Sequence, residues 1–285
     1  MKPDAPVPTP RADCPDCQGG GLLFGSDAGS ARAMVCPCGG ICPRCGDTGR
    51  LLLSDDGVRR VARCRCRLLH DRADHFNAAG LPGRHASSSF ANFMTNVPGA
   101  RGSFYQAQGW ANGDQSRGLI LYGEVGRGKT HLLAGALRTL IFDKGLRARF
   151  VEFSLLLADL KAGFEKGRGT SSLIAEALDT DVLAIDELGK GRNTEWELTV
   201  LDELVSRAYN DQKVLIATTN YRPGQATGAG PGNLALVGTE GQTSQTLGDR
   251  VGNRVFSRLC EMCDFVEVGR GGADFRLLQA RGMRS

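Results

Sequence analysis

The residues best suited to chemistry form one glycine-rich stretch, Gly123-Glu124-Val125-Gly126-Arg127-Gly128-Lys129-Thr130, with the spacing GxxxxGKT. An apolar run at 118–122 precedes it, and apolar residues at helical spacing follow it through 130–143. A strand, a glycine loop and a helix in this order bring backbone N–H groups and a helix N-terminus around phosphate groups. Glycine is required because a side chain would keep the backbone away from the phosphates.

The loop predicts a site for a nucleoside triphosphate with magnesium. Lys129 supplies positive charge for the β- and γ-phosphates, and the Thr130 hydroxyl is placed to ligate Mg²⁺. A chance glycine-rich turn before a helix is the alternative, and the sequence on both flanks disfavours it. We expect ATP to contact Gly123, Glu124, Val125, Gly126, Arg127, Gly128, Lys129, Thr130 and His131.

Two further polar groups follow apolar runs. Residues 182–185 lead into Asp186 and Glu187, and residues 213–218 lead into Asn220. Asp186 is expected to hold magnesium, directly or through water, and Glu187 to polarise the water that attacks the γ-phosphate. Asn220 could orient that water, or it could simply form the turn before the next proline.

Eight of the ten cysteines form an internal repeat with an offset of 28 residues. The first unit reads CPxC, a glycine turn, an expected hairpin and CxC, and the second unit has the same order. Four thiolates per unit suit tetrahedral zinc in a closed, structural shell, so we predict two zinc ions. The expected ligands are Cys14, Cys17, Cys36, Cys38, Cys42, Cys45, Cys64 and Cys66.

The sequence leaves the pairing of these cysteines and the purpose of the module open. Pairing within each repeat is the simpler arrangement, and a nested pairing of the outer with the outer and the inner with the inner cysteines is the alternative. The units resemble the zinc modules of DnaJ-type chaperones, a resemblance that implies metal binding only. The module could be a staple for a small domain or a docking site, and the arginines of the second repeat could face phosphate or solvent. Cys260 and Cys263 are expected to be core thiols.

Changes in composition and the positions of proline- and glycine-rich stretches divide the sequence into four expected segments. These are a disordered tail at 1–12, the zinc module at 13–69, a connector at 70–117 and an ATPase domain at 118–285 with a flexible loop at about 222–246. The net charge of +4 is compatible with nucleic acid but does not require it. No apolar run of about 18 residues and no signal peptide are present, which predicts a soluble, cytoplasmic protein without a membrane partner.

Arg250, Arg254 and Arg258 recur every four residues, on one face of a helix expected to run to about residue 262. Such a face is either solvated or supplies an arginine finger to the ATP of a neighbouring subunit.

Residues 76–280 resemble the AAA+ ATPases of the DnaC/DnaI type, which load the replicative helicase, and the related IstB transposition ATPases. The resemblance rests on FNAAGLPGR, GEVGRGKTHLL, LLADLKAGF, VLAIDELG, TTN, RVFSRLCEMCDFVEV and ADFR. It implies an α/β fold with a five-stranded parallel sheet in the order 5-1-4-3-2 and helices on both faces. The loop at 222–246 is longer than the family's, and the duplicated cysteine module is not shared by all members.

The resemblance also implies roles for individual residues. Lys129 and Thr130 match the Walker A pair, and Asp186 and Glu187 match the Walker B acids. Asn220 looks like sensor 1, Arg258 like the arginine finger and Arg276 like the second sensor. Lys161 and Phe164 fall where members of the family contact single-stranded DNA, a lysine for phosphate and an aromatic ring for a base.

The implied function is an ATPase that loads a replicative hexameric helicase. Its expected partners are the helicase, held by the zinc module, single-stranded DNA, and further copies of the chain joined through the ATP sites. An IstB-like transposition helper is the main alternative. A nucleotide-switched binding module without turnover is disfavoured by the intact Glu187, and the core sequence gives no support to a chaperone-like ATPase.

Overall fold

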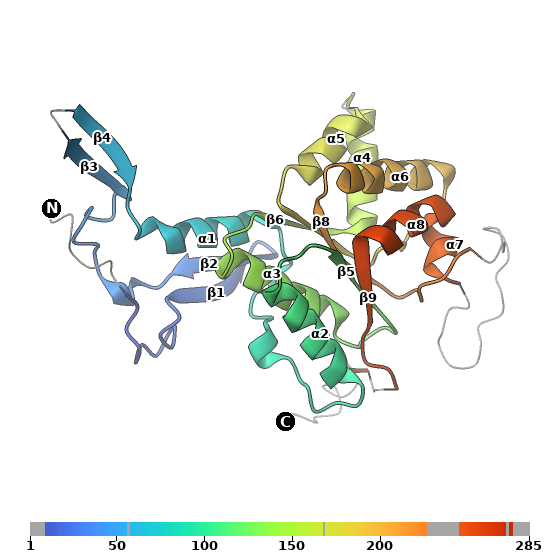
Figure 1. Ribbon diagram of the computed structural model, residues 1–285, viewed down its shortest axis with the longest axis horizontal. Helices are drawn as coiled ribbons and strands as arrows, with labels where there is room; N and C mark the ends of the chain where they lie inside the picture. Colours follow the sequence, from blue (N-terminus) through green and yellow to red (C-terminus); the bar gives the residue numbers. More distant parts are fainter. Residues whose placement is uncertain (1–8, 56–57, 168, 227–244, 272–273, 276–285) are drawn as a thin grey trace. The chain divides into compact units, whose positions relative to one another are not determined.

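A computed structural model describes residues 9–55, 58–167, 169–226, 245–271 and 274–275. The chain divides into two compact units, a smaller one of residues 1–87 with 141–145 and a larger one of residues 88–140 with 146–285. In Figure 1 the smaller unit runs from blue to cyan along the chain. Most of the expected tail, 1–8, and most of the expected loop, 227–244, lie outside the described residues.

The larger unit is organised around a five-stranded parallel sheet with the order β6-β7-β8-β5-β9. Numbered from the first strand of the sheet, this order is 5-1-4-3-2, so the prediction is confirmed. The central strands β5 and β7 are mostly apolar and almost entirely buried because helices cover both faces of a parallel sheet. The strands are β5 (Gly118–Tyr122), β6 (Ala148–Glu152), β7 (Val182–Asp186), β8 (Val214–Thr219) and β9 (Cys263–Glu267).

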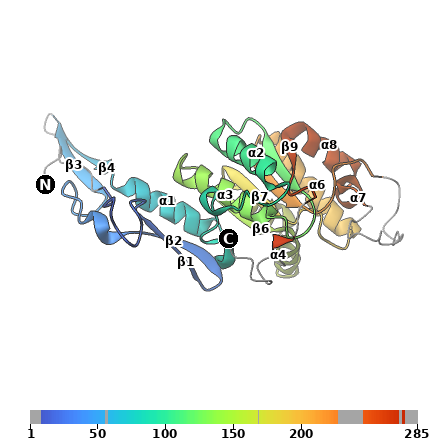
Figure 2. The same cartoon turned by 90° about the horizontal axis from the view of Figure 1, so that it is seen from below.

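The direction of each crossover decides which face a helix covers. The helix α3 (Lys129–Phe142) connects β5 to β6, whereas the later connections run back across the sheet. Because crossovers between parallel strands are right-handed, α3 lies on the opposite face from the later helices, as Figure 2 allows the reader to follow. The later helices are α4 (Phe153–Glu165), α5 (Thr170–Leu178), α6 (Glu195–Asn210), α7 (Leu247–Val251) and α8 (Asn253–Met262). They share one buried core with strand residues such as Leu183 and Leu215.

One helix expected from the sequence is two helices. Gly252 has φ 82° and ψ 150°, a conformation that ends α7 and lets α8 start in a new direction. The expectation of one arginine face is therefore wrong, since Arg250 belongs to α7 and Arg254 and Arg258 to α8. The prediction failed because the three arginines keep a helical spacing in the sequence even though Gly252 separates α7 from α8.

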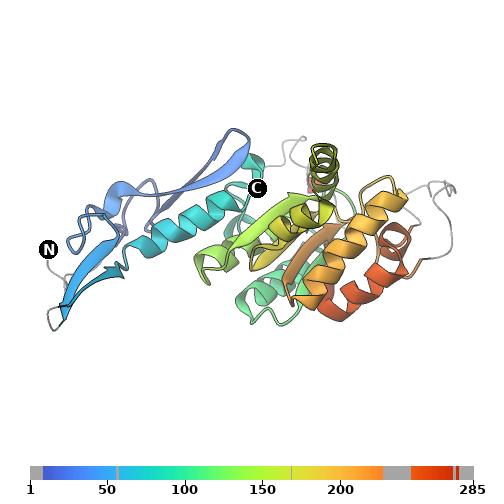
Figure 3. The same cartoon turned by 90° about the horizontal axis from the view of Figure 1, so that it is seen from above.

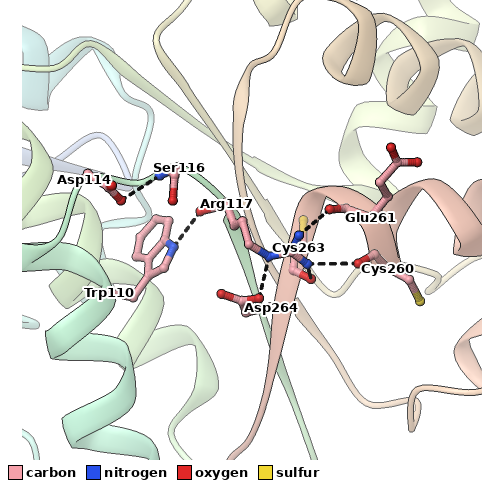
Figure 4. Close-up of polar contacts among 8 residues, drawn as sticks. All are labelled: Trp110, Asp114, Ser116, Arg117, Cys260, Glu261, Cys263 and Asp264. Atoms are coloured by element: carbon pink, nitrogen blue, oxygen red, sulfur yellow. Dashed lines mark hydrogen bonds and ion pairs between the residues drawn. The ribbon is translucent and has the colours of Figure 1, made fainter.

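The C-terminal end of α8 is fixed by Arg117, just ahead of β5 (Figure 4). The guanidinium donates to the carbonyls of Cys260 at 3.0 Å, Glu261 at 2.5 Å and Cys263 at 2.9 Å, and to Asp264 Oδ1 at 2.6 Å. The last carbonyls of a helix have no partners within it, so a cation here satisfies them. The expectation that Cys260 is a core thiol is wrong because Cys260 is exposed, whereas Cys263 is buried.

Upstream of β5, α2 (Ala100–Asn112) buries a stripe of small residues, and the short 3₁₀ helix η3 (Phe90–Asn92) precedes it. The ring of Phe104 on α2 lies 5.8 Å from Phe90 and 5.9 Å from Phe93. These aromatic residues pack on one another within the larger unit.

The smaller unit contains two antiparallel hairpins and one long helix (Figure 3). The hairpins are β1 (Leu22–Asp27) with β2 (Ser30–Val35), and β3 (Arg50–Asp55) with β4 (Val58–Arg63). The helix α1 (Arg67–Ala78) packs against the first hairpin, and the 3₁₀ helices η1 (Pro37–Gly39) and η2 (Gly83–His85) complete the unit. Among the described residues, no helix is long and apolar enough to cross a membrane.

Candidate nucleotide-binding site and metal sites

The glycine loop between β5 and α3 has a backbone that only glycine adopts readily. Gly123, Gly126 and Gly128 have φ values of 145°, 77° and 88°. A Cβ atom at Gly123 would lie 2.7 Å from the Val268 carbonyl oxygen, and one at Gly128 would lie 2.8 Å from the Phe93 ring. The loop thus has the conformation that phosphate binding needs and leads directly into the N-terminal end of α3, so the residues present suit a nucleotide.

Lys129 begins α3 and folds back over the loop. Its Nζ donates to the carbonyl oxygens of Gly123 at 2.8 Å and Glu124 at 2.6 Å, and the residue is 8% exposed. Arg127, within the loop, forms an ion pair with Glu124. The ammonium group is therefore held inside the loop by carbonyl oxygens, where phosphate oxygens would be better ligands for it.

Oxygen atoms suited to magnesium converge beside Lys129. The Thr130 hydroxyl donates to Asp186 Oδ1 at 3.0 Å, and Asp186 is 2% exposed. A carboxylate and a hydroxyl beside a phosphate-binding loop are oxygen ligands of the kind that Mg²⁺ binds. The structure brings the predicted pair together from α3 and from the end of β7.

A third hydroxyl, which the sequence analysis did not single out, joins this pair. Thr218 Oγ1 donates to Asp186 Oδ1 at 2.5 Å and accepts the backbone N–H of Glu187 at 3.0 Å. Thr218 is 1% exposed, so both bonds are shielded from water. The feature that could have indicated this role is the position of Thr218 near the end of β8, because β8 pairs with β7, the strand that ends in Asp186.

Glu187 has a strained backbone and an ion-paired carboxylate. Its φ of 57° is left-handed, a conformation that costs a non-glycine residue about 1–3 kcal/mol and occurs often at active sites. Its carboxylate pairs with Lys190, and this hydrogen bond raises the pKa of Lys190. The loop after Glu187 is fixed from α7, because Arg250 donates to the carbonyls of Gly189 at 3.0 Å and Gly191 at 2.5 Å.

Asn220 follows β8 and lines a pocket beside the glycine loop. The pocket is bounded by the ends of β5, β8 and β9, and Gly123, Glu124, Arg222 and Arg270 contribute to its wall. Asn220 thus lies at the same edge of the sheet as the loop and the acidic pair.

His131 is held by the segment that precedes α2. Its Nε2 lies 3.0 Å from the Ser89 carbonyl and 3.0 Å from Asn92 Oδ1, and its ring packs edge-on against Phe93. Burial lowers the pKa of His131, which favours a neutral ring. The contacts of His131 join the start of α3 to residues 89–93.

Arg258 contacts its own chain. Its Nη1 donates to Asp202 Oδ1 on α6 at 2.8 Å, and Arg254 Nε lies 3.6 Å from the same oxygen. Lys161 is exposed on α4. The side chain of Phe164 and the whole of Arg276 lie outside the described part of the structure.

The eight repeat cysteines form two clusters, each drawn from one repeat. Within each cluster the sulfur atoms all lie within 4.8 Å of one another, so cysteines pair within each repeat and the nested alternative is wrong. Four sulfurs about 2.3 Å from a zinc ion define a tetrahedron with edges of about 3.8 Å. The observed separations include 3.8 Å for Cys14–Cys36 and 3.9 Å for Cys42–Cys64, so both clusters suit zinc.

The backbone around the clusters repeats as the sequence does. Cys36 N–H donates to the Gly21 carbonyl at 2.9 Å, and Cys64 N–H donates to the Gly49 carbonyl at 2.9 Å. Hydrogen bonds from the backbone N–H groups of Cys17 and Asp16 lower the pKa of Cys14 to about 7, whereas at Cys36 the effect of the Cys38 backbone N–H is outweighed by burial and the neighbouring thiols, which raise the pKa to about 12. A lowered thiol pKa favours the thiolate form that binds metal.

Comparison with known proteins identifies the family. A model of the IstB-like ATP binding proteins matches residues 72–226. The chain is 33% identical over 150 residues to a protein of Mycobacterium tuberculosis that is described as an ATP-binding protein in an insertion sequence. This match covers 51% of this chain and 58% of that protein. It is 23% identical over 148 residues to the replicative helicase loader DnaC of Escherichia coli, covering 51% and 60%.

The fold has a solved relative. The crystal structure of the DnaC helicase loader superposes with a TM-score of 0.53 at 25% identity, covering 65% of this chain and 98% of that one. The matches to the two curated relatives span 58% and 60% of those proteins' own lengths. Since the family model spans more than half of the sequence, this chain, with its AAA+ P-loop fold, belongs to the IstB-like ATP-binding protein family.

Proposed function

We propose that the protein is an ATP-hydrolysing loader of a replicative hexameric DNA helicase. The observation that carries this proposal is the likeness to the solved DnaC loader, which extends over 98% of that chain at 25% identity. The geometry of the glycine loop, Asp186 and Glu187 supports the proposal, because these residues would supply the chemistry that such an ATPase requires.

The residues of the nucleotide site would divide the reaction between them. The amides of the glycine loop and the ammonium of Lys129 would bind the phosphates, and Thr130 and Asp186 would hold magnesium, which supplies charge neutralisation when bound. Glu187 would accept a proton from water, and Asn220 would orient that water. Glu187 is paired with Lys190 in this structure, so it would have to exchange this partner for the water.

Assembly would join copies of the chain through their ATP sites. Arg258 would reach the nucleotide of a neighbouring copy, where a guanidinium stabilises the charge of phosphoryl transfer. To do so it would leave Asp202, which it contacts at 2.8 Å within its own chain. Arg276 is proposed as the second sensor by family resemblance.

The remaining parts would bind macromolecules. Lys161, exposed on α4, and Phe164 are proposed contacts for the backbone and a base of single-stranded DNA. The zinc module at 13–69, which lies wholly outside the family match, is proposed to dock the helicase.

A second candidate, an ATPase that assists DNA transposition, is favoured by one observation. The identity to the insertion-sequence protein of Mycobacterium tuberculosis is 33%, compared with 23% for DnaC. The two candidates share the ATP site and differ in the partner.

The test is light scattering after size-exclusion chromatography of the full chain with the replicative helicase of its own source. The Glu187→Gln variant keeps the loop that binds ATP but lacks the base, so it should hold a stable ATP-bound complex, whereas Lys129→Ala should not. A helicase complex seen with the first variant and lost with the second supports the loader. If the helicase never binds but a transposase from the same source does, the second candidate replaces it.

A further inference from the structure

The two hairpins of the smaller unit are related by the repeat but differ in what covers them. An offset of 28 residues maps Phe24 onto Leu52 and Ala33 onto Val61. The strand registers agree, because Phe24 faces Ala33 in the first hairpin and Leu52 faces Val61 in the second. The same position on the same face can therefore be compared between the repeats.

In the first hairpin a helix covers this face. The Phe24 ring packs edge-on against Phe76 of α1 at 5.6 Å, and Ala33 is 2% exposed. Asn77 of α1 also holds the outer edge of β2, since its Oδ1 accepts the Ala33 N–H at 2.7 Å and its Nδ2 donates to the Ala33 carbonyl at 3.0 Å. The first repeat thus shows how a helix with one aromatic and one amide side chain seats on this hairpin.

In the second hairpin the equivalent face is open. Leu52 is 69% exposed and Val61 is 66% exposed. The hairpin is anchored through its other face, where Leu51 is 8% exposed and packs on the buried Cys42, Cys45 and Cys64. The exposed apolar pair Leu52 and Val61 therefore lies on a hairpin whose position is fixed through its opposite face by the cysteine cluster.

The charged side chains that the second hairpin itself places around the apolar pair are all arginines. Strand alternation places Arg50 on the face of Leu52, and Arg59 and Arg63 on the face of Val61. Arg50 lies directly opposite Arg63, an arrangement of like charges that is unfavourable by itself. Arg63 also reaches Asp71 at 2.6 Å but stays 71% exposed.

We propose that this second-hairpin face, Arg50, Leu52, Arg59, Val61 and Arg63, docks an amphipathic helix of a partner protein whose apolar stripe is flanked by Asp and Glu. The helix would cover Leu52 and Val61 as α1 covers Phe24 and Ala33, and its carboxylates would meet the arginines. The proposal concerns the chemistry of the docked helix and holds whether or not the partner is a helicase.

The probe is a phage-displayed library of helical peptides selected on the immobilised, zinc-loaded full chain. Stripe positions vary among Leu, Ile, Phe and Met, and flanking positions vary among Asp, Glu, Lys, Arg and Gln. The test variant is Leu52→Ser/Val61→Ser, and the matched control is Met34→Ser, which changes a side chain that is 64% exposed on the first hairpin. Zinc content checks that each variant keeps its metal sites.

The expected result is enrichment of Asp and Glu at the flanks, with binding at least tenfold weaker to the double variant and unchanged for the control. A second variant, Arg50→Glu/Arg59→Glu, should shift the selection toward Lys and Arg flanks. Absence of binders, flanks without acidic preference, or helices that bind the double variant equally well would overturn the proposal. A double variant altered only in self-association would assign the face to a second copy instead.

Discussion

At the scale of single residues, the site depends on one buried hydroxyl as much as on its charged groups. Thr218 donates to Asp186 and accepts from the Glu187 backbone, so one side chain sets the position of both acids. The left-handed backbone of Glu187 needs such an external hold, because strained conformations persist only where the surroundings determine them.

Replacing Thr218 by valine should lower the rate of ATP hydrolysis about tenfold or more, because both acids lose a fixed partner. It should also lower the free energy of unfolding by about 1–3 kcal/mol, since buried polar groups are left without a bond. Thr219→Val is the matched control: Thr219 is equally buried and donates to the Leu188 carbonyl at 2.8 Å. It should cost similar stability, measured by denaturant unfolding, but leave steady-state hydrolysis within about twofold. Equal rates for the two variants would remove Thr218 from the site.

The residues that a motif fixes by local spacing could be predicted, and those fixed by strand pairing could not. Lys129, Thr130 and Asp186 follow from the glycine loop and the acidic strand end, and the structure brings them together. Thr218 reaches Asp186 because Ile185 pairs with Ala217, a register that joins distant parts of the chain. No local pattern reports such a pairing.

At the scale of elements, the break between α7 and α8 determines where the candidate arginine finger lies. The four-residue spacing of the arginines predicts one continuous helix across Gly252. The sequence alone does not reveal the break, because a helix tolerates a glycine and only the backbone conformation of Gly252 ends α7. The strands and most helices could be predicted, since buried apolar runs and amphipathic stretches are local features. The order of the strands could be predicted only from the resemblance to a known family, and the observed order agrees with it. Serine favours the N-cap position of a helix, but Ser154 lies inside α4, which starts at Phe153, and its hydroxyl donates to Glu152.

Gly252→Ala should lower the free energy of unfolding by about 1–3 kcal/mol, because φ 82° with ψ 150° suits glycine almost alone. A Cβ atom there would meet nothing within 4 Å, so the cost would be purely conformational. Gly102→Ala in α2, where the added Cβ also meets nothing, is the control and should stabilise by about 0.5–1 kcal/mol. Urea unfolding measures both. If Gly252→Ala had no effect on stability, α7 and α8 could form one continuous helix. The conclusion that Arg258 lies on a separate helix from Arg250 would then be wrong.

At the scale of the whole molecule, the chain joins a nucleotide site and a duplicated cysteine module in separate compact units. The duplication was visible in the sequence because the cysteine spacing repeats without a gap. The difference between the hairpins was not visible, because α1 lies after both repeats and nothing in its sequence tells which hairpin it covers. The repeats therefore have equivalent cysteine clusters but different surfaces.

Because each cluster draws its four sulfurs from one repeat, the two metal sites should be lost separately. The full chain should contain two zinc ions by mass spectrometry of its metal content, and Cys42→Ser/Cys45→Ser should contain one. Binding of a structural zinc is worth about 10–16 kcal/mol at neutral pH, so the loss should unfold the second hairpin. Amide hydrogen exchange should then rise across residues 50–63 and stay low across 22–35, while ATP affinity changes less than about twofold, since the glycine loop belongs to the other unit. The mirror variant Cys14→Ser/Cys17→Ser should expose the first hairpin and spare the second. Loss of both ions from either variant would mean that the clusters fold as one site, and would contradict the pairing within repeats.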